Sequence, residues 1–258
     1  MMRRVPVLLI ALLAAAAHAA AQGTAEWTEP FPPFKIAGNL YYVGTKGLAS
    51  YLVATPEGHI LINSNLEATV PMVRDSIEKL GFKFTDVKIL LISHAHWDHV
   101  GGADLFPRAT VWIQRDEYTY YLGEAWHARN THGGIDPRDM AALLEINTEG
   151  RLRFVNGDDQ EILPGIRCYT GGRHTHASQY VSAQTAGGTA VLTSDNMYLY
   201  ENMEKHAPIA QTLDAKSNLA AQDRIRRLAS DPSLIVPGHD PAVFERYPHV
   251  SDDVVRIK

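Results

Sequence analysis

The stretch Val87–His99, VKILLISHAHWDH, joins an apolar run to a cluster of side chains that bind metals. The run Val87–Ile92 is short and apolar, which is typical of a buried β-strand. Three imidazoles and one carboxylate follow within six residues, and both groups are ligands of transition metals. The stretch therefore predicts a metal site at the end of a strand, built from His94, His96, Asp98 and His99.

The spacing of these ligands indicates that one segment can serve two adjacent metals. His94 and His96 are two residues apart, so in an extended segment their rings point to the same side. Asp98 and His99 follow on the expected turn into a helix. The chain has a single cysteine, Cys168, which we expect to pack within a strand, so the cysteine cluster common in closed structural zinc sites is missing. Mixed nitrogen and oxygen ligands favour zinc, with iron, manganese and cobalt as alternatives.

The first residues have the pattern of a secretory signal peptide. Arg3 and Arg4 precede the apolar run Val5–Ala17, and small residues that suit cleavage follow near Ala19 to Ala21. The apolar run is shorter than the roughly 20 residues that a membrane-spanning helix needs, and no later run replaces it. We therefore expect residues 1–21 to be a signal peptide and the mature protein to be periplasmic or secreted, without a membrane span.

Composition is typical of a globular protein and argues against a nucleic-acid partner. The hydrophobic content is 45% and the formal net charge is −5, and the charge becomes more negative once Arg3 and Arg4 are removed. No long run of Lys and Arg is present, so binding through phosphate neutralisation is not expected. Residues 22–258 show no linker and are predicted to form one domain.

Apolar periodicity predicts an α/β fold in which two sheets lie between helices. The polar and aromatic segment 123–148 is interpreted as a lid or substrate loop, and five aromatic residues could line an apolar pocket or belong to the core: Trp97, Trp126, Tyr118, Tyr120 and Tyr121. The pattern indicates an antiparallel meander over 34–63, helices over 70–80, from 116 and over 215–229, and strands at 110–113, 165–170, 179–183, 189–193 and 234–236.

Three later motifs, each at the end of an expected strand, complete a pattern that resembles the metallo-β-lactamase superfamily. They are His174 in GRHT, Asp195 in TSDN and His239 in PGHD. The resemblance covers essentially the whole mature chain and implies an αββα sandwich of two mixed β-sheets flanked by helices. It also implies two Zn²⁺ ions with a hydroxide between them: the first held by His94, His96 and His174, the second by Asp98, His99 and His239, with Asp195 bridging.

Two positions depart from the usual pattern of that superfamily. His176 follows His174 closely and could compete as the ligand, but Thr175 and Ser178 keep the family register and favour His174. Asn63 stands where many relatives carry an aspartate, which leaves the orientation of the nearby histidine-rich loop open.

The two halves of the chain resemble different branches of the superfamily. Residues 34–102 are similar to histidine-rich, cysteine-free metallo-β-lactamases. The later half is similar to N-acyl homoserine lactonases, which carry a bridging aspartate, here Asp195, and a tyrosine three residues beyond it, here Tyr198. The resemblance implies that Tyr198 donates a hydrogen bond to the substrate carbonyl or oxyanion; the alternative is a buried tyrosine in a strand-end loop.

These features favour an exported dinuclear zinc hydrolase that opens a lactone ring, as N-acyl homoserine lactonases do, by attack of a metal-bridging hydroxide. In this interpretation Asp98 orients the nucleophile or moves its proton. The partner is a small cyclic ester or amide. The alternatives are a metallo-β-lactamase that hydrolyses the β-lactam amide, and a non-catalytic zinc-binding protein whose metal only holds the fold.

Overall fold

The computed structural model describes residues 25–127, 133–246, 249–251 and 254–255. The predicted signal peptide, residues 1–21, lies outside the described residues. Within the described ranges, none of the helices has the length and apolar character needed to cross a bilayer.

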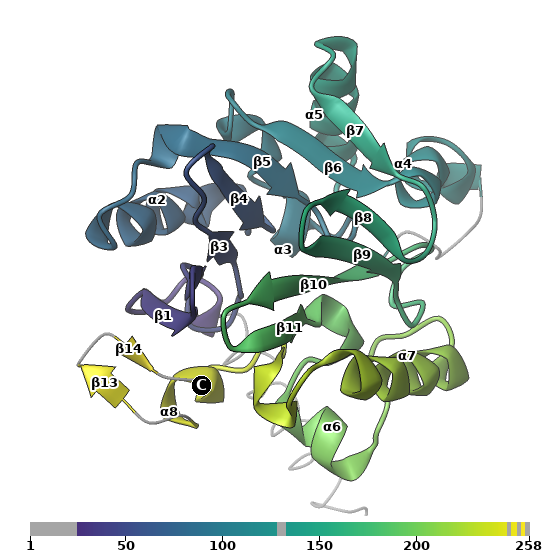
Figure 1. The fold of residues 1–258 in the computed structure, drawn as a ribbon. Coiled ribbons are helices and arrows are strands. Elements are labelled where there is room, and N and C mark those ends of the chain that lie inside the picture. The colour runs from purple at the N-terminus through teal and green to yellow at the C-terminus, as the bar shows by residue number, and fades with distance from the viewer. Residues whose placement is uncertain (1–24, 128–132, 247–248, 252–253, 256–258) are drawn as a thin grey trace, which may run out of the picture.

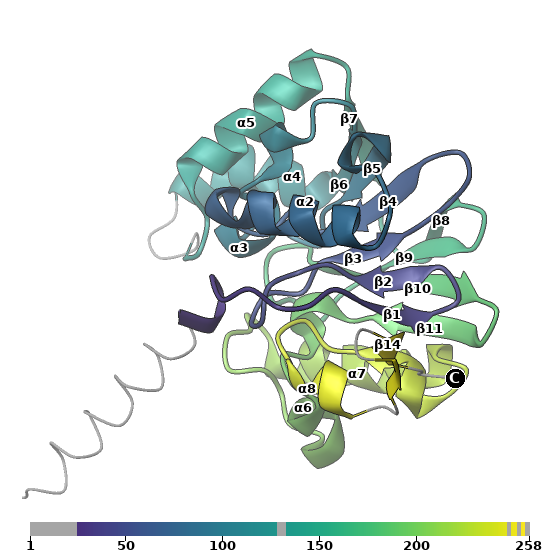
Figure 2. The ribbon, with the colours of Figure 1, turned by 90° about the vertical axis from the view of Figure 1, so that its left-hand side faces the viewer.

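The described strands form two mixed sheets that pack face to face (Figures 1 and 2). The larger has the order β13-β14-β1-β2-β3-β4-β5-β6-β7 and the smaller β12-β11-β10-β9-β8. Neighbours from β1 to β4 are antiparallel, whereas β4 to β7 are parallel. The strand bounds are β1 Phe34–Ala37, β2 Leu40–Tyr42, β3 Tyr51–Val53, β4 His59–Ile62, β5 Val87–Leu91, β6 Thr110–Gln114, β7 Leu152–Val155, β8 Gln160–Leu163, β9 Ile166–Thr170, β10 Gln179–Thr185, β11 Gly188–Leu192, β12 Ile235–Val236, β13 His249–Ser251 and β14 Val254–Val255.

Helices cover the outer face of each sheet, which completes the predicted αββα sandwich (Figure 2). Side chains of α2, α4 and α5 share one buried cluster with the larger sheet, and α7 packs on the smaller sheet. The central cluster lies between the sheets and includes Phe34, Leu91 and Val181. The helix bounds are α2 Val70–Lys79, α3 Trp97–Val100, α4 Arg115–Leu122, α5 Pro137–Thr148, α6 Tyr200–Lys205, α7 Ala215–Leu228 and α8 Ala242–Glu245, with short 3₁₀ turns η1 Glu67–Thr69, η2 Phe84–Asp86, η3 Ala103–Leu105, η4 Glu124–His127, η5 Ser194–Asn196 and η6 Pro232–Leu234.

Local sequence explains why the predicted helices form where they do. In α2, Val70, Val73 and Ile77 recur at helical spacing and are all buried, so one face of the helix packs on the sheet. Gly81 follows with φ +85°, a left-handed conformation that glycine adopts at low cost after a helix. The predicted antiparallel meander and the helices at 70–80 and 215–229 are confirmed, with end shifts of one or two residues.

The interpretation of 123–148 as one loop is wrong in its second half, and residues 128–132 of its first half lie outside the described residues. Residues 137–148 form α5, whose Met140, Leu143 and Ile146 are buried at helical spacing. The Asp136 side chain caps this helix by accepting a hydrogen bond from the backbone of Arg138 at 2.8 Å, which satisfies one of its free N–H groups. Ala141 and Leu144 are exposed between these buried positions, so the apolar residues of the segment do not mark one face by themselves. Two edge strands, β7 and β8, were also not predicted, because their alternation is interrupted by charged and polar residues.

Candidate metal centre

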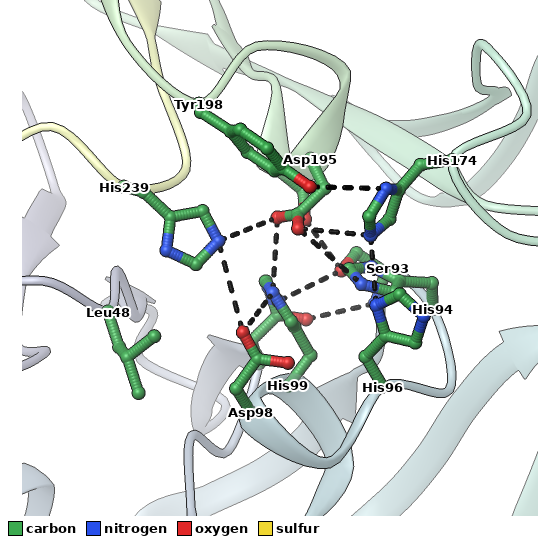
Figure 3. Close-up of polar contacts among 12 residues, drawn as sticks. Leu48, Ser93, His94, His96, Asp98, His99, His174, Asp195, Tyr198 and His239 are labelled. Atoms are coloured by element: carbon green, nitrogen blue, oxygen red, sulfur yellow. Dashed lines mark hydrogen bonds and ion pairs between the residues drawn. The ribbon is translucent and has the colours of Figure 1, made fainter. Parts of the chain in front are cut away.

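The predicted ligands lie on four separate segments, and the fold brings all of them together. The segment Ser93–His99 follows β5, and His174 lies between β9 and β10. Asp195 is in η5, just after β11, and His239 follows β12. Because Leu192 of β11 and Val236 of β12 are paired in parallel register, the segments that follow these strands emerge at the same edge. Figure 3 shows the seven side chains converging.

These side chains form two groups of the kind that holds a metal ion. In each group the candidate ligand atoms all lie within 4.8 Å of one another. The first group is His94, His96, His174 and Asp195, and the second is Asp98, His99 and His239. This division matches the ligand sets implied by the resemblance.

Asp195 lies between the two groups and faces each with a different oxygen (Figure 3). Its Oδ2 is 3.2 Å from Nε2 of His174 and 3.8 Å from Nε2 of His94. Its Oδ1 is 3.1 Å from Nε2 of His99 and 3.1 Å from Nε2 of His239. A carboxylate placed in this way can bind one cation with each oxygen, which is the arrangement required of a bridging ligand.

The hydrogen bonds of the imidazoles leave ligand nitrogens free for metal. Nδ1 of His174 donates to the carbonyl oxygen of Gln211 at 2.6 Å, and Nδ1 of His239 donates to that of Gly47 at 2.9 Å. A carbonyl only accepts, so Nε2 of both rings is left unprotonated in the neutral imidazole. Among the described residues the buried Nε2 of His94 has no hydrogen-bond partner. An unpaired buried nitrogen is costly, and a metal ion would satisfy it.

Charge differs between the two groups. Burial lowers the pKa of His96 to about 4 and also lowers that of His94, so these rings are neutral and able to coordinate at neutral pH. Burial also opposes a charge on His99, but the carboxylates of Asp195 and Asp98 outweigh it and raise its pKa to about 10. The second group therefore favours positive charge, from a proton or from a divalent cation.

His174, and not His176, lies in the first group. The ring of His176 stacks on Tyr120 with centroids 3.9 Å apart and planes at 8°. The backbone N–H of His176 donates to the hydroxyl of Tyr121 at 3.3 Å. The structure thus places the competing histidine in an aromatic contact away from the ligand cluster.

Asn63 anchors the histidine-rich loop in place of an aspartate. Its Oδ1 accepts a hydrogen bond from the backbone N–H of Ser93 at 2.9 Å, and its φ of 64° is in the left-handed region that asparagine tolerates. The hydroxyl of Ser93 in turn lies 3.0 Å from Nδ1 of His94. An amide oxygen therefore supplies the acceptor that the start of the loop requires.

A cavity of about 730 Å³ opens beside the metal ligands. Trp27 and Trp97 form one wall, with ring centroids 5.4 Å apart. Of the five aromatic residues considered for a pocket, only Trp97 lines this cavity; Tyr118 and Tyr121 belong to the core. Besides five of the ligands, the lining consists of Glu26, Trp27, Gly47, Trp97, Gly133, Gly134, Tyr198, Leu199, Ala210 and Gln211.

Residues 26–27 hold in place the loop that orients His239 of the second ligand group. The sequence did not predict this role. The carbonyl of Glu26 accepts from the N–H of Gly47 at 3.1 Å, and that of Trp27 accepts from the Thr45 hydroxyl at 2.8 Å. Gly47 is the residue whose carbonyl fixes His239. The acceptors in these contacts are backbone carbonyls, which every residue carries, so no side-chain motif at 26–27 signals them.

Tyr198 presents its hydroxyl to the cavity beside His174 (Figure 3). The hydroxyl oxygen is 3.4 Å from Nδ1 of His174, but that nitrogen already donates to Gln211 and has no lone pair to offer. Burial and the nearby carboxylate of Asp195 raise the pKa of the phenol, so it stays protonated at neutral pH. Its hydrogen is available to a bound molecule.

Together the αββα sandwich and the two His/Asp groups at its strand ends define a metal-dependent hydrolase. The chain belongs to the metallo-beta-lactamase superfamily, whose family model matches residues 44–239. Among curated proteins, an N-acyl homoserine lactonase from Bacillus thuringiensis is 26% identical over 187 residues, 71% of this chain and 67% of that protein.

Solved structures of a metallo-beta-lactamase and of a lactonase both resemble this chain. A metallo-beta-lactamase from Legionella gormanii is 38% identical with a TM-score of 0.50, over 64% of each chain, so part of that enzyme lies outside the comparison. A B. thuringiensis AiiA variant, with N-decanoyl-L-homoserine bound at its active site, has a TM-score of 0.65 at 20% identity and covers 83% of this chain and 98% of its own. The latter likeness shows the fold.

Proposed function

We propose that the protein is a dinuclear zinc hydrolase that opens the ring of a lactone, of the N-acyl homoserine lactone type. The charge of the cavity is the observation that favours a lactone over a β-lactam as the substrate. None of the cavity residues in the described part of the chain is Lys or Arg, and the one charged group besides the ligands is Glu26. Lys46, next to Gly47, is paired with Glu26 at 3.2 Å and Glu29 at 3.3 Å. A neutral lactone suits this cavity better than a β-lactam, which bears a carboxylate at neutral pH.

The roles of the residues follow from their positions. Bound zinc ions would supply a water-derived nucleophile at neutral pH and polarise the substrate carbonyl. Asp98 lines the cavity, with Oδ2 3.4 Å from Nε2 of His99, where it can orient the nucleophile and carry its proton. Tyr198 donates its hydrogen bond to the carbonyl oxygen, on which negative charge develops.

The test compares a lactone and a β-lactam on the same zinc-loaded protein. We expect acid release from an N-acyl homoserine lactone with a higher kcat/KM than nitrocefin hydrolysis, and loss of the lactone activity in Asp98→Asn and His96→Ala. Nitrocefin turnover that exceeds lactone turnover would instead support a metallo-β-lactamase. That second candidate is favoured by the 38% identity to the Legionella gormanii enzyme.

Export is part of the same proposal. The pattern of residues 1–21 supports cleavage near Ala19 to Ala21 and a mature periplasmic or secreted domain over 22–258. The N-terminal sequence and mass of the protein recovered from the periplasm and the medium would check it. A mass that retains Met1 would contradict export by cleavage.

Removing the hydroxyl of Tyr198 is expected to lower turnover without emptying the site. Tyr198→Phe keeps the ring that packs beside His174 and His239 and removes only the donor. Loss of one such donor lowers kcat by about 10²-fold. Steady-state kinetics and zinc content together check this, and Tyr41→Phe is the control, since Tyr41 lies outside the cavity. Unchanged kcat would leave Tyr198 with a packing role.

A further inference from the structure

Glu117 is a fully buried carboxylate outside the two ligand groups. It lies on α4, has no exposed surface, and does not line the cavity. Burial raises the pKa of its carboxyl group, while the backbone donors of Ala95 and Ala177 act in the opposite direction. A buried acid is costly unless its oxygens are hydrogen-bonded, so its partners indicate what it does.

The two oxygens of Glu117 accept hydrogen bonds from two different ligand segments. Oε1 accepts from the N–H of Ala95 at 3.0 Å, and Ala95 stands between His94 and His96. Oε2 accepts from the N–H of Ala177 at 2.6 Å, on the segment that carries His174. One side chain therefore joins the two segments that provide all three imidazoles of the first group.

Other residues of α4 hold the second of these segments. The hydroxyl of Tyr121 accepts from the N–H of His176 at 3.3 Å, and Tyr120 stacks on the ring of His176. Among the side chains of α4 that the structure describes, Glu117 is the one that hydrogen-bonds to both segments. The carboxylate thus helps to set the distance between the two segments, together with the hydrogen bond that the N–H of Gln179 donates to the carbonyl of Ser93 at 2.9 Å.

We propose that Glu117 is a positioning residue that helps to set the separation of the His94–His96 and His174 segments and so tunes the affinity of the first metal group. Glu117 does not touch the substrate or the metal; it acts through the backbone on either side of the ligands. The proposal deepens the proposed function, but it concerns metal affinity and holds whichever cyclic substrate the enzyme takes.

Glu117→Gln is the most direct test, because the amide keeps the shape and changes one oxygen into an N–H donor. That donor would face a backbone N–H of one segment and push the segment away. We expect zinc affinity at the first group to fall by about 10- to 100-fold, while affinity at the Asp98–His99–His239 group and the unfolding midpoint of the metal-free protein change little. Titration with zinc against a competing fluorescent chelator measures both affinities.

The matched control is Asp116→Asn, the preceding acid on the same helix, which is exposed and should leave both affinities unchanged. Glu117→Asp keeps two acceptor oxygens and the charge but shortens the reach, so an intermediate loss of affinity at the first group is expected. Unchanged zinc affinity in Glu117→Gln overturns the proposal. Failure of both Glu117 variants to fold also overturns it, since the carboxylate would then serve the core. Zinc titration needs no substrate, so it tests the role of Glu117 even if the protein proves to have no lactonase activity.

Discussion

Asp195→Asn is expected to lower the kcat/KM of lactone hydrolysis by well over 100-fold and to leave the protein with fewer bound metal ions. The two oxygens of Asp195 face different groups, Oδ2 toward His174 and Oδ1 toward His239. In asparagine one of these atoms becomes an NH₂ group, which cannot coordinate a cation. Changing a residue that merely orients a metal ligand lowers metal affinity or activity by about 10- to 100-fold. Changing a ligand shared by two metals should lower them further.

Elemental analysis of metal content, alongside lactone kinetics, checks this expectation. Asp75→Asn on the exposed face of α2 makes the same chemical change away from the site and should alter neither quantity. If Asp195→Asn retained its metals and its full turnover, the carboxylate could not be a bridging ligand.

Most of the ligand set could be predicted from sequence because each ligand carries a local signature. The apolar run ending at Ile92 marks the strand, and His94 to His99 follow it at once. His174, Asp195 and His239 each come after a short apolar run, so the family pattern could be recognised without coordinates. The choice of His174 over His176 rested on the family register of Thr175 and Ser178. The structure agrees, since His174 lies in the first ligand group and His176 does not.

The supporting contacts could not be predicted, because they join segments that are distant in sequence. Glu117 is one acid in the polar pattern of α4, and nothing in that pattern separates it from the exposed Asp116. The acceptors for His174 and His239 are backbone carbonyls of Gln211 and Gly47, and every residue carries a carbonyl. Tertiary packing selects the ones that are used.

Three elements were not predicted from the sequence: α5, β7 and β8. α5 has the apolar spacing of a helix at Met140, Leu143 and Ile146, but it follows the polar and aromatic residues of 123–136 directly and was interpreted with them as one loop. The edge strands β7 and β8 pair on one side only and do not need the predominantly apolar sequence of the central strand β5.

Removing the metal with a chelator is expected to abolish lactone hydrolysis and to destabilise the fold. Without a cation, Nε2 of His94 is buried and unpaired, and the carboxylates of Asp98 and Asp195 depend on protonated imidazole for compensation. A ligand present at 100 times its Kd stabilises a folded protein by about 2.7 kcal/mol. For a chain of this size that corresponds to a Tm lower by roughly 5–10 °C after chelation.

Thermal unfolding and lactone kinetics, each before chelation, after it and after zinc is restored, check both parts. Zinc should restore the Tm and the activity together. His96→Ala, which lacks one ligand of the first group, should show a smaller shift in Tm upon chelation. The combination separates the hydrolase from a protein whose metal only holds the fold, because such a protein would lose stability without having any lactone turnover to lose. Activity that survives complete removal of metal would contradict the assignment of both ligand groups to catalysis.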